Sequence, residues 1–317
     1  WENTHEYNFG LEFSLFNYRL SGELDLYKRI NNNAILPLQL PTTFGFDPFL
    51  SHVGKITNKG AEMSLSWADK FSENLSYNIS TNISYNSNEL SEISNQFFTN
   101  QVGGNINNGQ YTKRVSVGQP LGSFFLYEVE GIDDRGQFVY KDLNDDGLVN
   151  EEDRRFFGSF IPSFTSSLNL KINYKNFDFN LDTYGSFGNK VYNGKKAQRF
   201  GNENIEQYVF NNRWTTGRPS STTPRASNNV PLSSDYFLES GDFVRINNIT
   251  LGYSFDSIKL KLINKMRVYV TAKNPLIFKR FSGFTPELSG DPLGLAGIEL
   301  DAYPTLSSYF VGFNMTF

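Results

Sequence analysis

The residues best suited to chemistry lie in one stretch, 142–153, which reads Asp-Leu-Asn-Asp-Asp-Gly-Leu-Val-Asn-Glu-Glu-Asp. Oxygen-bearing side chains occupy its positions 1, 3, 5, 9 and 12, and glycine occupies position 6. A loop that wraps Ca²⁺ needs this spacing, because it must supply about six or seven oxygens and turn sharply at the glycine. The expected ligands are Asp142, Asn144, Asp146, the Leu148 carbonyl, Asn150 and Asp153.

Position 12 of this stretch is Asp153, where helix-loop-helix calcium sensors place glutamate. The variant is similar to that of extracellular calcium modules, so we expect a structural ion that orders a loop. The alternative is a turn rich in Asp and Asn that binds no metal.

Residues for catalysis are few. The chain has no Cys, which excludes disulfides, thiolate catalysis and Cys-ligated zinc, and its two histidines, His5 and His52, are far apart. Gly-x-Ser-x-Gly, His-Glu-x-x-His and glycine-rich phosphate motifs are all missing from the sequence. Glu128 and Glu130 alternate on one strand-like face, which favours a structural role over a glycosidase pair. We therefore predict that the chain is not an enzyme.

Aromatic residues in polar connections are the stronger functional lead. Such rings stack on sugars or peptides, although packing among the loops is the more common reason for them. The candidate substrate-binding residues are Phe97, Phe98, Tyr111, Tyr208, Trp214, Tyr236 and Tyr303.

The composition is unusual for a soluble enzyme. Aromatics make up 16% of the 317 residues, yet only 38% are hydrophobic and the mean hydropathy is −0.43. A membrane β-barrel combines these features, because its apolar outer band and aromatic girdles are diluted by a polar lumen and long loops. The sequence has no apolar run of about 18 residues, so no transmembrane helix is expected. A net charge of −4 gives no support for nucleic-acid binding.

Strict alternation of apolar and polar residues supports the barrel. In 75–86, Leu, Tyr and Ile alternate with Ser and Asn, and 309–317 alternates in the same way. A period of two places each set on one face of a strand, as a wall between lipid and a wet lumen requires, although one strand alone fits a soluble sandwich as well. We predict that Leu11, Phe13, Leu24, Ile79, Leu170, Leu251, Val270 and Phe313 face lipid, and that Glu12, Asp25, Asn78, Asn82, Asn180 and Asn314 face the lumen.

The connections between these strands alternate between short and long. Tight turns are expected near 17–18, 71–74 and 175–176 and a modest one over 256–265, and long connections over 31–59, 86–162, 188–241 and 274–303. Outer-membrane barrels have this arrangement, with short periplasmic turns and long extracellular loops. The fold class is therefore all-β, with about nine strands of an antiparallel transmembrane barrel. Bacterial single-chain barrels have an even number of strands, and nine cannot close around external loops of this bulk, so we expect the rest to come from residues ahead of Trp1 or from another chain.

The sequence also resembles a known family, the SusC/RagA TonB-dependent outer-membrane transporters of Gram-negative bacteria. The matching stretches are 58–62, 118–132, 140–154, 177–193 and 267–274. The resemblance implies that 1–317 is the carboxy-terminal part of a barrel of roughly 22 strands. Residues 87–162 are then an extracellular loop with the calcium-type insert at 142–153.

The resemblance further implies a plug, a SusD-type surface lipoprotein over the barrel, and TonB-driven import of oligosaccharides or peptides. The plug and the TonB-contacting segment are expected ahead of Trp1, where the chain starts without Met or a signal region. The alternative function is an adhesin or ligand-binding barrel that transports nothing.

Overall fold

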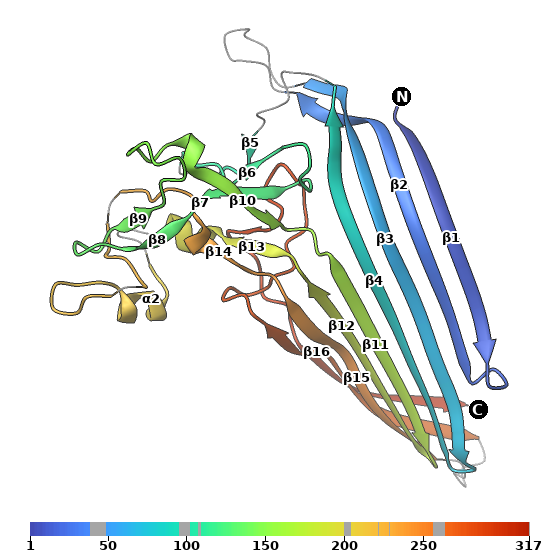
Figure 1. The fold of residues 1–317 in the computed structure, drawn as a ribbon. Coiled ribbons are helices and arrows are strands. Elements are labelled where there is room, and N and C mark those ends of the chain that lie inside the picture. Colours follow the sequence, from blue (N-terminus) through green and yellow to red (C-terminus); the bar gives the residue numbers. More distant parts are fainter. Residues whose placement is uncertain are drawn as a thin grey trace.

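A computed structural model describes residues 1–38, 49–94, 102–106, 109–199, 204–220, 222–227, 229–255 and 264–316. Its main feature is a nine-stranded antiparallel sheet with two free edges, β1 and β18 (Figure 1). The strands of the sheet, in spatial order, are β1 (Asn3–Leu15), β2 (Leu20–Leu38), β3 (Phe49–Ser72), β4 (Leu75–Ile93), β11 (Phe164–Tyr174), β12 (Phe177–Phe187), β15 (Phe243–Phe255), β16 (Lys265–Lys279) and β18 (Ser308–Thr316).

The register of this sheet confirms that each predicted set shares one face. Leu11 pairs with Leu24, Ile79 with Leu170, and Leu251 with Val270, so the apolar positions form continuous rows across neighbouring strands. Ile79, Leu251, Val270 and Phe313 expose 41%, 47%, 50% and 68% of their surface. An apolar face left this open is what a barrel wall turns toward lipid.

Short turns join the strands at one end of the wall. β1 and β2 connect through Phe16, Asn17 and Tyr18, which all have positive φ, and β11 and β12 connect at Lys175, with φ 51°. The turn between β3 and β4 lies at 73–74, and most of the one expected at 256–265 lies outside the described residues. The positions of the tight turns are therefore confirmed.

The strands run further than predicted at the opposite end. The expected connection over 31–59 is wrong at both ends, because β2 continues to Leu38 and β3 begins at Phe49. Similarly, β4 continues to Ile93, so the next connection starts later than residue 87. β3 has 24 residues, whereas about 9–11 cross a bilayer, so these strands extend well beyond it.

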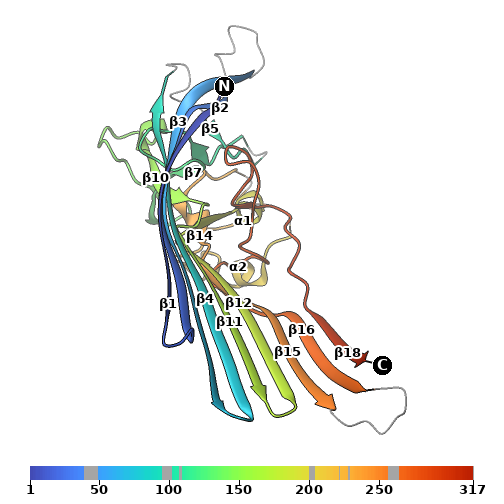
Figure 2. The same ribbon diagram turned by 90° about the vertical axis from the view of Figure 1, so that its right-hand side faces the viewer.

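The long connections fold into a body of short elements at the ends of β11 and β12 opposite their tight turn, beside the longer strands β2, β3 and β4 (Figure 1; Figure 2). In the connection between β4 and β11, β7 pairs with β10. Three small sheets, with strand orders β10-β7-β6-β5, β14-β13-β17 and β8-β9, lie in this body. Their strands are β5 (Val102–Gly103), β6 (Lys113–Arg114), β7 (Ser123–Tyr127), β8 (Val129–Ile132), β9 (Phe138–Tyr140), β10 (Arg154–Ser159), β13 (Lys190–Asn193), β14 (Leu238–Ser240) and β17 (Ile298–Glu299).

The described helices are short: α1 (Gly194–Gln198), α2 (Gln207–Asn212) and the 3₁₀ turns η3 (Glu151–Asp153) and η4 (Asp235–Phe237). None of the helices in the described residues is long and apolar enough to cross a membrane.

The described hydrophobic core lies in the connections and at the extended ends of the wall strands that meet them. One cluster of buried side chains gathers residues from widely separated segments: Ile106, Phe124, Leu126, Tyr192, Ala197, Phe237 and Ile298. A second cluster packs the extended ends of β2, β3 and β4 against the connection between β4 and β11, through Leu36, Val53, Leu90 and Val115. The connections therefore form one packed body that holds side chains in fixed positions.

Candidate functional site

The polar face of the wall carries a ladder of hydrogen bonds between side chains. Ser64 donates to Asn82 at 2.8 Å, and Thr250 and Thr271 are 2.8 Å apart at their hydroxyl oxygens. Asn180 donates to Asp182 at 2.7 Å, and Asn169 also binds that carboxylate. Polar groups in such numbers need water or each other, so this face suits a wet lumen.

An ion pair braces the same face near the hairpin end. Arg267 donates to both oxygens of Asp178, at 2.8 and 2.5 Å. Gly252 lies directly beneath the pair, where a Cβ would be 2.4 Å from an Asp178 oxygen and 2.7 Å from the Arg267 Nε. Glycine therefore makes room for the bridge.

The predicted calcium loop is tightly turned. Asp145 and Gly147 have φ of 57° and 82°, and the Gly147 N–H donates to Asp142 Oδ2 at 2.7 Å. The Leu148 N–H donates to Asp146 Oδ1 at 2.8 Å. These bonds hold the oxygens on the inside of the turn and leave each carboxylate with further lone pairs.

Asp153 has a second role in this loop. It forms a capping box with Asn150 at η3 and accepts hydrogen bonds from the backbone N–H groups of Asn150 and Leu143, both at 2.7 Å. The bond from Asn150, with that from Leu143, lowers the pKa of Asp153. Within the described residues, no three Asp, Glu, His or Cys side chains are gathered as a metal site. The donors fit calcium only if Asp153 shares its oxygens between the cap and the ion.

The aromatic candidates divide by position. Phe97 and Phe98 lie outside the described residues. Tyr111 packs against the Arg154 guanidinium at 3.9 Å from its ring centre, and Trp214 lies over Gly136. Tyr303 is 90% exposed and lines none of the described pockets treated below. Tyr208 and Tyr236 line two adjoining hollows.

The larger hollow is a cleft of about 750 Å³ among the connections. Its lining combines charged and aromatic side chains from several segments: Lys195, Lys196, Arg199, Glu206, Tyr208, Glu239, Phe284 and Glu299 are among them. The sheet β14-β13-β17 brings these segments together, since β13 pairs with β14 on one side and with β17 on the other. A cleft of this size accommodates a small oligomeric ligand.

The charged side chains of this cleft differ in whether they have a partner within the protein. Lys195 lies 3.1 Å from Glu299, whose side chain is 1% exposed. Glu239 accepts hydrogen bonds from the Ser282 N–H at 2.7 Å and from Asn193 at 3.0 Å. Burial lowers the pKa of Lys196, against the opposite effect of Glu239, and its ammonium lies 4.3 Å from the Tyr236 ring centre.

Comparisons with known proteins point to one kind of protein. SusC of Bacteroides thetaiotaomicron, a TonB-dependent receptor, is 27% identical over the whole chain, and TonB-dependent receptor P26 of Formosa agariphila is 29% identical. The chain covers 32% and 35% of these proteins. Over its whole length the chain is therefore similar to proteins named as TonB-dependent receptors.

A solved structure supports the same fold. The chain matches the structure described as the RagAB peptide transporter over all of its length, with a TM-score of 0.84 and 24% identity. The match covers 36% of the chain in that structure. No protein-family model matches the chain. The described nine-stranded sheet thus has the fold of a segment of a transmembrane β-barrel wall. The relatives are receptors by name and not enzymes, as predicted. The chain spans about a third of the length of the relatives it matches.

The basic residues of the cleft, Lys195, Lys196 and Arg199, were not predicted from the sequence. Lys195, Lys196 and Arg199 follow one another within or just after α1, whose first turn is capped by Asn193, which accepts from the Lys196 N–H at 2.9 Å. The only signal was this dense run of cations in an otherwise Asn-rich connection. Glu239 and Glu299 carry no sequence signal, because their proximity depends on the small sheet.

Proposed function

We propose that this chain is part of an outer-membrane receptor that imports oligosaccharides or peptides in a TonB-dependent manner. The observation that carries the proposal is the continuous polar face across the nine-stranded wall, in a chain similar over its whole length to TonB-dependent receptors. A polar lining of this kind suits a wet lumen through which a hydrophilic substrate passes.

The proposal includes partners of the barrel. Strands from the rest of the protein complete the wall along β1 and β18, a plug fills it, and the TonB complex acts through segments outside this chain. A SusD-type lipoprotein covers the end that carries the long connections. In support, those connections gather at one end of the wall, and a fold relative is described as the RagAB peptide importer in an open-open state.

Substrate would enter past the cleft at α1 and α2. Tyr208 exposes 68% of its surface there, and Phe284 exposes 56%. Open rings beside hydrogen-bonding and charged groups are how such clefts hold sugars or peptides.

The function is tested in the native bacterium by deleting the gene and measuring uptake of labelled oligosaccharide and peptide pools. Loss of uptake, equal to the loss on TonB deletion, is expected, and the tagged receptor should co-purify with a lipoprotein. Unchanged uptake with retained surface binding of the pools would instead identify a binding barrel or adhesin.

We also propose that 142–153 binds structural Ca²⁺ outside the membrane, through Asp142, Asn144, Asp146, the Leu148 carbonyl, Asn150 and Asp153. The turned backbone and inward oxygens support this. Chelation, or Asp142→Ala with Asp146→Ala, should expose the connection between β4 and β11 to protease while the barrel stays folded. The matched control is Asp133→Ala, in a neighbouring turn where the Asp133 carboxylate accepts hydrogen bonds from the backbone N–H groups of Arg135 and Gln137. Protease sensitivity unchanged by chelation would contradict the calcium proposal.

A further inference from the structure

A small recess adjoins the cleft and differs from it in its lining residues. Its walls are largely apolar, formed by Ile205, Val209, Pro224 and the Tyr236 ring. The space is about 30 Å³, against roughly 10–15 Å³ for a single water, so it admits a small aliphatic group. The recess shares Lys196, Arg199 and Glu206 with the cleft, so a ligand in one continues into the other.

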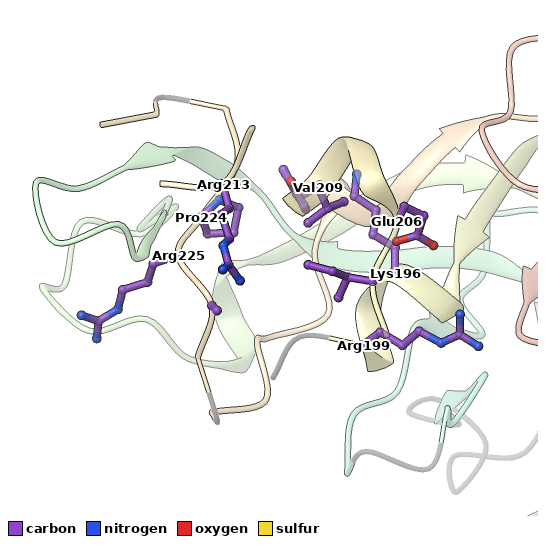
Figure 3. A pocket seen from close by; sticks show the side chains of 10 residues that line it. Lys196, Arg199, Glu206, Val209, Arg213, Pro224 and Arg225 are labelled. Carbon is purple, nitrogen blue, oxygen red and sulfur yellow. The ribbon is translucent and has the colours of Figure 1, made fainter. Parts of the chain in front are cut away.

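Cations surround this recess. Figure 3 shows the Arg213 guanidinium lying between the Pro224 segment and the α2 side, whereas Arg225 and Arg199 extend away in opposite directions. Lys196 approaches from the other side, over the Tyr236 ring. Neither Arg213 nor Lys196 forms an ion pair with a carboxylate in the described parts of the chain. Glu206 is the one carboxylate among the described lining residues, and it is exposed.

The half-buried Lys196 ammonium has three donors, and none binds an acceptor among the residues that the structure describes. An anionic oxygen in the recess would accept from it and from Arg213 by charge-assisted hydrogen bonds. The same ligand must place an apolar group against Ile205 and Val209. The recess therefore suits a ligand that carries an apolar group close to a carboxylate.

We propose that the recess binds the carboxyl-terminal residue of a peptide, with a small apolar side chain against Ile205 and Val209 and the carboxylate at Arg213 and Lys196. A sugar acid fits less well, because its ring hydroxyls would lose water against apolar walls that offer few partners. The preceding peptide residues run into the cleft, where Tyr208 and Phe284 are open. This inference rests on the proposed function, and names the substrate class.

The test uses the purified full-length receptor and two pools of random hexapeptides, one with free carboxyl termini and one amidated. Mass spectrometry of the retained peptides should show a roughly tenfold preference for the free pool, as one charge-assisted bond provides, and enrichment of Val, Ile, Leu or Ala at the last position. Arg213→Gln and Lys196→Gln should each reduce both preferences. Arg218→Gln, an exposed arginine on the same connection, should leave them intact.

Equal retention of both pools, or retention of neither, would overturn the inference. TonB-dependent peptide uptake with no carboxyl-terminal preference would remove this site assignment and leave the proposed function standing. Absence of TonB-dependent uptake in cells would instead remove the proposed function.

Discussion

Placing an arginine on either face of β4 tests the assignment of the two faces. Ile79 lies five residues above the turn at Asn74, which at about 3.4 Å per residue and a tilt near 45° raises it ~12 Å. The apolar band of such a barrel is about 25 Å tall, so Ile79 lies close to its middle. Ile79→Arg should therefore cost about 2–4 kcal/mol of barrel stability. Ser80→Arg, one residue further on the polar face beside Ser66 and Asn169, should cost less than about 1 kcal/mol.

The assay is denaturant unfolding of the full-length receptor in lipid vesicles, with folded yield in the outer membrane as a second measure. Ser80 is a matched control because it lies at nearly the same depth in the membrane as Ile79 and, like Ile79, pairs with a strand on each side. Equal costs for the two arginines, or a larger cost at Ser80, would refute the face assignment.

Two further predictions concern close packing. Gly252→Val should cost about 1–3 kcal/mol by displacing the Asp178–Arg267 pair, as measured by unfolding, whereas Gly217→Val, with nothing near its Cβ position, should cost far less. Lys113 is buried and donates to the carbonyls of Pro292, Gly294 and Ala296. Burial lowers its pKa to about 8 from 10.5, so the unfolded chain binds more protons between these values, and stability should rise as pH increases from 8 to 10.5. The rise is measured as increasing protease resistance of the connections between pH 8 and 10.5, and Lys113→Met should remove it. A rise that persists in the variant would contradict its attribution to Lys113.

The wall could be predicted from sequence because its signal is local. Alternating residues such as Leu75 to Asn86 fix both the strand and its faces, and the register confirmed the pairing that this implies. The pattern failed at the ends of β2 and β3. There the register shifts between Asn31 and Ala34, and Asn33 has φ of 58°, so the alternation changes phase while pairing continues.

The cleft and recess could not be predicted, because distant segments build them. Lys196, Arg213 and Tyr236 belong to three stretches that are separated in the sequence and line one recess only in the folded connections. Strands of two to six residues and helices of five or six carry too little periodicity to be seen. Tyr111 and Trp214 pack within the connections, as the alternative interpretation of the loop aromatics allowed.

The most direct measurement of the central claim, that this wall separates lipid from a wet lumen, is a cysteine scan of β4. The chain has no Cys, so single cysteines can be placed from Ser76 to Ser84 in the full-length receptor once any cysteines elsewhere are replaced. A membrane-impermeant maleimide should label 76, 78, 80, 82 and 84 strongly and the intervening positions weakly. A lipid-soluble quencher should show the opposite pattern, quenching labels at the intervening positions strongly and those at the even positions weakly. Uniform labelling along the strand, or labelling without a period of two, would contradict the claim.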